Sequence, residues 1–312
     1  MTATLERPPD PAPTEFDLLA DLAGVSGRRR VKNTVMTILM GASVAIILVV
    51  LVLVLITVVS KGWSIVTSQF PEWFTKDIQL SPRRPGPGMK AAIVGTIVMT
   101  LAATAIAVPL GIAGAVYLNE YGKRNVFARI LRFFTSVMAG VPSIVMGLFI
   151  YVFWVVPRGT DGLNGLSGAF ALACLMLPIV VRSTEEMLKL VPQNLRDASY
   201  ALGGTSSRTT LTVVIPKAAP GIISGALLAI ARAAGETAPL IFTIGAAKRT
   251  NWNVFDGTNT SLSLQIYANA KEAFETAHER AWGAALTLIA IAILFTIAAR
   301  ILSARISKGA AS

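Results

Sequence analysis

Charged side chains are scarce in this sequence. Aspartate, glutamate, lysine and arginine make up 14% of its 312 residues, whereas hydrophobic residues make up 54%. A soluble domain of this length rarely has so little charge, but a membrane protein with several spans routinely does. The net charge of +11 does not favour nucleic-acid binding, because the basic residues neither cluster with aromatic residues nor line one face. Membrane topology explains them more simply.

Residues that commonly carry catalysis or metal binding are also few. The single cysteine, Cys174, excludes an intramolecular disulfide and a cysteine-based metal cluster. The single histidine, His278, has no second histidine or cysteine near it in the sequence, so we expect no metal site. The sequence contains no G-x-x-x-x-G-K-[ST] run, so the chain cannot cradle ATP by itself. We therefore expect neither a catalytic site nor a bound cofactor.

The first 32 residues are rich in proline, alanine and acidic side chains, and we expect a flexible polar tail. An uncharged run, 33–60, follows them. The apolar core of a cleaved signal peptide has about 7–15 residues, whereas a membrane-spanning helix needs about 20. The run 33–60 is therefore a retained span.

Five further apolar stretches complete an all-α membrane protein with six expected spans. Each span must be helical, because lipid offers no partner for exposed backbone groups. Pro109 and Pro142 fall inside spans, where we expect them to kink the helices. The expected spans lie within one transmembrane domain of residues 33–305, at 33–60, 91–119, 133–157, 162–186, 218–247 and 281–302.

The positions of lysine and arginine predict the orientation. With the N-terminus in the cytoplasm, 17 of the 28 basic residues fall in the tail, the cytoplasmic loops and the C-terminus, and 10 fall on the other side. Cytoplasmic segments carry the excess of basic residues in membrane proteins. We expect both termini to be cytoplasmic.

The expected cytoplasmic loop 187–217 carries its own helical signals. Gly203 is placed to end a first short helix in a left-handed cap. Thr205 or Ser206 can cap a second short helix, which we expect Pro216 to stop. The small apolar residues of this helix–turn–helix could receive another protein, and an amphipathic hairpin on the membrane surface is an equally good interpretation.

An arginine and a glutamate interrupt the fifth apolar stretch. Counted from Gly221 to Gly245, Arg232 is near the middle, with Glu236 one helical turn later. The pair could be a bundle-internal ion pair with a packing role only, but charges within the membrane more often mark a water-filled path.

A guanidinium suits an oxyanion, because its planar fork donates two parallel hydrogen bonds and stays charged at any working pH. Glu236 could occupy the fork of Arg232 until an anion displaces it, and Thr237 adds a hydroxyl donor. Arg182 at the cytoplasmic end of the fourth span is a weaker candidate, because snorkelling to the interface explains it adequately. We interpret the pair as an anion-handling gate on a substrate pathway.

The loop resembles the coupling motif of type I ATP-binding-cassette importer membrane subunits, E-A-A, three residues, G, nine residues, I-x-L-P. Here the motif reads Asp197-Ala198-Ser199, then Gly203, then Val213-Val214-Ile215-Pro216. The resemblance implies that this segment is a coupling helix that sits in a groove of an ATPase subunit.

Three longer stretches are similar to the phosphate-specific permeases of the PstA type. They are "AGVPSIVMGLF" at 139–149, "LPIVVRSTEE" at 177–186 and "ARAAGETAPLIF" at 231–242. The resemblance covers roughly 90–305. It implies a phosphate importer in a bacterial cell membrane, with a PstC-like sister permease, two copies of an ATPase that bind the ATP, and an extracytoplasmic phosphate-binding protein.

Three alternatives are open at this point. The permease could serve another oxyanion, such as phosphonate, sulfate or molybdate, since an arginine in the membrane suits any of these. A proton-coupled secondary carrier with Glu236 as its proton site is less compatible with six spans that show no evident internal repeat. A non-transporting membrane scaffold would tolerate replacement of Arg232.

Overall fold

The computed structural model describes residues 27–86, 88–122 and 125–309, and all regular elements in these ranges are helical. Six helical segments within these ranges are long and apolar enough to cross a membrane. The elements are α2 (Gly27–Ser68), α3 (Glu72–Thr75), α4 (Lys90–Val116), the π-helical turn η1 (Tyr117–Tyr121), α5 (Val126–Gly140), α6 (Ser143–Ile150), the π-helical η2 (Tyr151–Val155), the 3-10 helix η3 (Val156–Gly162), α7 (Gly165–Lys189), α8 (Gln193–Ala201), α9 (Ser206–Thr209), the π-helical η4 (Thr210–Val214), α10 (Ile215–Gly235), α11 (Leu240–Thr243), α12 (Leu262–Ala270) and α13 (Glu275–Gly309).

The chain divides into two compact units, residues 1–57 and 58–312. The described part of the first unit is residues 27–57 of α2, and the expected span 33–60 lies within the whole of α2. Residues 27–32, which the sequence assigned to the polar tail, are already helical, and the rest of that tail lies outside the described residues.

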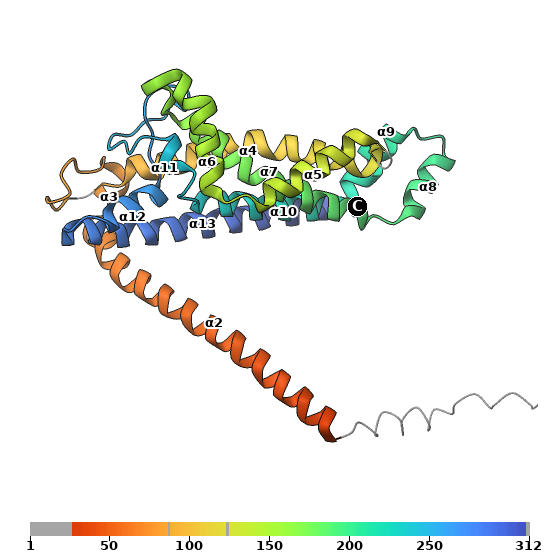
Figure 1. Cartoon of the computed structure of the whole chain (residues 1–312), viewed down its shortest axis with the longest axis horizontal. Coiled ribbons are helices and arrows are strands. Elements are labelled where there is room, and N and C mark those ends of the chain that lie inside the picture. Colours follow the sequence, from red (N-terminus) through yellow and green to blue (C-terminus); the bar gives the residue numbers. More distant parts are fainter. Residues whose placement is uncertain (1–26, 87, 123–124, 310–312) are drawn as a thin grey trace, which may run out of the picture. The chain divides into compact units, whose positions relative to one another are not determined.

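In the second unit, α4, α7, α10 and α13 pack side by side (Figure 1). The main core joins Ala103 of α4, Leu172 of α7 and Ala229 of α10. Small residues allow the close approach that membrane helices use in place of a hydrophobic driving force. A Cβ on Gly225 of α10 would collide with the Oγ of Ser183 in α7. Helices α8 and α9 lie together at one end of this bundle, and α3 and α12 lie toward the other (Figure 1).

The third span differs from its expected bounds of 133–157. Instead of a kinked helix, the chain forms two helices, α5 and α6, with a break at Val141 and Pro142. Both residues are extended, with ψ of 132° and 139°. The ring of Pro142 disfavours a helical conformation at Val141, so the chain leaves the helix before the proline. The candidate span is Ser143–Gly162.

The fifth span is also shifted from its expected bounds of 218–247. It is continuous from Ser206 to Gly235. Pro216 does not stop the second short helix, because it lies in the first turn of α10 directly after the π-helical turn η4. A proline is tolerated in a first helical turn, where its missing N–H breaks no regular bond. The helix instead ends before Glu236, which is extended, and Pro239 follows.

Candidate functional site

Arg232 and Glu236 are brought together at the end of α10. The Nε of Arg232 lies 3.4 Å from Oε1 of Glu236. Arg232 is in the last helical turn, where a cation interacts favourably with the helix dipole, and Glu236 is the residue at which the helix ends. The side chain of Arg232 is 64% exposed and that of Glu236 is 19% exposed. Within the unit 58–312, the side chain of Arg232 is therefore mostly uncovered, whereas most of the Glu236 side chain is enclosed.

The end of α10 lies level with the middle of the neighbouring helices. Ala229 and Ala233, on the buried side of α10, share a core with Ala103 at the middle of α4 and with Leu172 of α7. Arg232 is at the end of a helix, and not in the middle of one as the sequence had suggested. Sequence reasoning missed this end, although glycine before a glutamate and a nearby proline is a helix-stop signal.

An uncovered strip runs along α10 to this arginine. Lys217, Ser224, Leu228 and Arg232 are exposed at intervals of seven, four and four residues, which places them on one helix face. The packing within residues 58–312 leaves this face open. Arg232 therefore presents its guanidinium outward from the unit, where an anion or a second chain can reach it.

The segment after the helix break is held by α12. The Oγ of Ser263 donates a hydrogen bond to the main-chain oxygen of Glu236 at 2.8 Å. Thr237 follows directly and is half-buried, and its main-chain oxygen accepts from the N–H of Leu240 at the start of α11. The structure thus keeps Glu236 and Thr237 in a fixed turn next to Arg232.

Arg182 lies in a different place from this pair. It projects from α7 and donates to the Oγ of Ser136 in α5 at 3.3 Å. It lines a hollow of about 490 Å³ together with Arg132, Glu185 and Lys189. Glu185 forms ion pairs with Arg132 at 3.2 Å and with Lys189 at 3.1 Å. The hollow therefore collects three cations and one carboxylate, which gives it an excess of positive charge. The lining of this hollow does not include Arg232.

The projecting segment of residues 192–209, which we name the knob, contains α8 and α9. Gly203 has φ of +81°, as expected for a left-handed helix end. The side chain of Thr205 caps α9 by accepting from the N–H of Arg208, so of the two expected capping residues Thr205 is the one used. The hydroxyls of Ser199 and Thr209 lie 2.8 Å apart and join the two helices.

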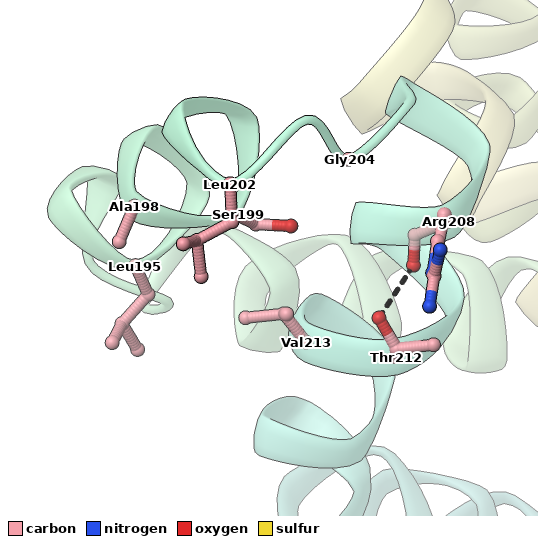
Figure 2. A pocket seen from close by; sticks show the side chains of 8 residues that line it. All are labelled: Leu195, Ala198, Ser199, Leu202, Gly204, Arg208, Thr212 and Val213. Carbon is pink, nitrogen blue, oxygen red and sulfur yellow. Dashed lines mark hydrogen bonds between the residues drawn. The ribbon is translucent and has the colours of Figure 1, made fainter.

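One face of the knob is hollowed. Figure 2 shows Leu195 and Ala198 of α8 and Leu202 just after it on one side of this hollow, with Val213 of η4 across from them. Its volume is about 420 Å³. Leu202 is 90% exposed and lines this hollow together with Leu195 and Val213, so the hollow has an apolar lining of the kind that a protein partner covers. Asp197 and Ala198 are exposed, and Asp197 accepts a hydrogen bond from Gln193 within α8.

Sequence reasoning missed the residue that fixes the knob to the bundle. Arg196 is 7% exposed and forms an ion pair with Glu120, 76 residues earlier in the chain. Its neighbour Asp197 belongs to the motif and faces outward, whereas Arg196 faces the bundle. A single sequence carries no signal for such a long-range pair.

The chain matches known proteins along most of its length. The family of binding-protein-dependent transport system inner membrane components matches residues 107–308. The chain belongs to this family. The phosphate transport system permease protein PstA of Mycobacterium leprae is 44% identical over 92% of this chain and 95% of its own. The PstA of Pasteurella multocida is 37% identical over 90% of this chain and 97% of its own. These relatives place the chain in the PstA group of the family.

Solved structures agree on the fold. A chain of the MetNI methionine ABC transporter has a TM-score of 0.55 and 18% identity, with 69% of this chain and 93% of that chain covered. The expected architecture is confirmed: an all-α, multi-pass membrane protein of the type I importer permease class. Because members of this family are components of multi-subunit transport systems, this permease functions with other subunits.

Proposed function

We propose that this chain is the membrane-spanning permease subunit of an ATP-driven importer of inorganic phosphate. The proposal is carried by the 44% identity with a protein named as a phosphate transport system permease, which extends over nearly the whole of both chains. Transport proceeds by alternating access, in which the helical bundle exposes one path first to one side of the membrane and then to the other. The chain binds no ATP and needs no cofactor of its own.

The chemistry at the end of α10 supports an anionic substrate. Arg232 makes a single long contact with Glu236, at 3.4 Å, and 64% of its side chain is exposed. A phosphate that reached it would exchange this contact for a bidentate, charge-assisted pair. Thr237 would add a hydroxyl donor from the same turn. Arg182 would act later on the path, in the positively charged hollow beside α5.

The uncovered surfaces support the expected partners. A PstC-like sister permease would cover the strip of α10 that ends at Arg232, so that the path runs between two chains. An ATPase dimer would receive the knob, with the hollow beside Leu202 and the exposed Asp197 at the contact. An extracytoplasmic phosphate-binding protein would deliver substrate at the end opposite the knob. In this arrangement the knob and both termini are on the cytoplasmic side of a bacterial cell membrane.

Uptake measurements on the complete complex test the proposal. Vesicles containing the complex should take up phosphate only with ATP, and vanadate should stop the uptake whereas an uncoupler should not. Uptake that responds to the uncoupler and not to vanadate would instead indicate a proton-coupled carrier. Competition with sulfate, molybdate and a phosphonate should leave phosphate uptake nearly unchanged. Strong inhibition by one of these anions would identify it as the substrate.

Substitution of Arg232 tests the pathway. Arg232→Ala should abolish phosphate uptake while the complex still assembles, because no other cation in the described residues is paired with Glu236. Arg232→Lys keeps the charge but loses the bidentate fork, so it should retain a small part of the uptake. Normal uptake by the alanine variant in an assembled complex would remove Arg232 from the pathway.

A further inference from the structure

The knob has covalent connections to two helices of the bundle and not to a third. Residues 190–192 join α8 to α7, and the chain passes from α9 through η4 into α10. Helix α4 packs closely against α7, but its nearest end, continued by η1, lies about 70 residues before the knob in the sequence. Any displacement of the knob must therefore reach α4 through side chains.

The side chain of Arg196 makes that connection. Its Nη2 lies 2.9 Å from Oε1 of Glu120, which is in η1 at the end of α4. The same guanidinium donates to the main-chain oxygen of Leu188, in the last turn of α7, and to that of Val191 just beyond it, both at 3.1 Å. The last carbonyls of a helix lack partners within the helix, so a cation is well placed there. One side chain of α8 thus holds the ends of both α4 and α7.

The ion pair between Arg196 and Glu120 is buried and therefore difficult to break. The side chain of Arg196 is 9% exposed and that of Glu120 is 7% exposed. The amide of Asn119 donates to the same carboxylate oxygen at 2.7 Å, which further fixes Glu120. Separating a buried ion pair leaves an uncompensated charge, so this contact resists breaking far more than an exposed one. A hydrogen bond from Tyr121 of η1 to Ser207 of the knob is, by contrast, exposed and 3.4 Å long.

We propose that the Glu120–Arg196 pair is the mechanical link that transmits movement of the knob to α4, and so couples ATP hydrolysis to opening of the path. Both are positioning residues, because neither lies at the end of α10 where the substrate is expected. This inference rests on the proposed function of an ATP-driven importer. It differs from a stabilising role in one measurable respect: loss of the pair should change the amount of substrate moved per ATP, and not only the amount of complex.

Reconstituted complex in proteoliposomes tests the link, with phosphate uptake and ATP hydrolysis measured on the same sample. Glu120→Gln removes the charge and keeps the size of the side chain. We expect this variant to assemble and to hydrolyse ATP, with at least tenfold less phosphate imported per ATP. Arg196→Lys keeps a cation beside Glu120, so its loss should be smaller. Glu72→Gln is the matched control, because the Lys76–Glu72 ion pair is exposed and away from the knob.

The possible outcomes distinguish failure of the proposed link from failure of the proposed phosphate-import function. A Glu120→Gln complex that imports as much phosphate per ATP as the unaltered complex would overturn the link. Failure of both Glu120→Gln and Arg196→Lys to assemble would also overturn it, since the pair would then be a structural element only. If the unaltered complex shows no ATP-dependent phosphate uptake, the proposed function itself is wrong.

Discussion

Gly147 of α6 lies directly against Pro239, the proline that follows the helix break after Arg232. A Cβ on Gly147 would be 2.5 Å from the Cα of Pro239 and 2.6 Å from its main-chain oxygen, closer than atoms can approach. Two stretches that resemble the PstA group, around residues 139–149 and 231–242, are thus in contact in the fold. The glycine at 147 allows the turn beside Arg232 to pack against α6.

Enlarging Gly147 should therefore displace that turn. Gly147→Val should lower stability by about 1–3 kcal/mol, the usual cost of overpacking a close contact, and should reduce phosphate uptake by more than the loss of complex explains. Thermal unfolding of the purified complex and uptake per complex would measure the two effects. Gly140→Val is the control, because a Cβ at Gly140 meets nothing within 4 Å. Equal behaviour of the two variants would contradict the prediction.

Neutralising Glu236 should strengthen the binding of phosphate and slow its release. If Glu236 competes with phosphate for Arg232, then Glu236→Gln weakens the competitor, and phosphate should bind more tightly and leave more slowly. We expect both the KM and the maximal rate of uptake to fall. The concentration dependence of initial uptake rates would show this. An unchanged KM with a normal rate would mean that Glu236 does not compete for the arginine.

The function of the knob should depend on whether residue 203 can adopt a left-handed backbone conformation, and not on the size of its side chain. Gly203 has open space around its Cα, but its φ of +81° strains any β-branched side chain. Gly203→Val should therefore weaken the retention of the ATPase subunit during purification and reduce ATP-driven uptake. Gly203→Asn should be tolerated well, because asparagine adopts left-handed conformations more readily. A valine variant that co-purifies normally and transports normally would show that this helix end is unimportant for coupling.

Arg280 should matter for stability and not for coupling. It is 3% exposed and donates from Nη2 to the main-chain oxygen of Pro82 at 2.7 Å, and from Nε to that of Thr276 at 3.2 Å. Arg280→Met should lower the free energy of unfolding by about 2–4 kcal/mol, because the carbonyls of Pro82, Thr276 and Ser81 lose a charged donor. The effect should appear as a lower Tm, with normal phosphate uptake per ATP in the complex that forms. Arg83→Met, at an exposed arginine over the ring of Phe274, should change Tm much less.

Local signals in the sequence predicted the features that depend on neighbouring residues. The number of apolar helices follows from hydropathy, and the left-handed end at Gly203 and the cap at Thr205 follow from residue type and position. The prolines were less informative. Pro142 interrupts a helix and Pro216 does not, because a preceding π-helical turn places Pro216 at the start of a new regular segment.

Features that depend on distant parts of the chain could not be predicted from one sequence. Arg232 and Glu236 were identified because they are four residues apart on an apolar background. Arg196 was not, although it is the more buried arginine, because its partner Glu120 is 76 residues away. Likewise, nothing in the sequence indicated that Arg182 would face Ser136 in α5.

The early end of α10 also bears on how the complete transporter seals. The last carbonyls of a helix have no regular partner within it, and in the proposed importer α10 ends inside the membrane, where lipid offers none. Water or a polar neighbour must therefore reach this level in every stage of the cycle. Where water fills this role, protons and small solutes can leak along it, so the resting impermeability of the transporter depends on how tightly the helices pack on either side of this point.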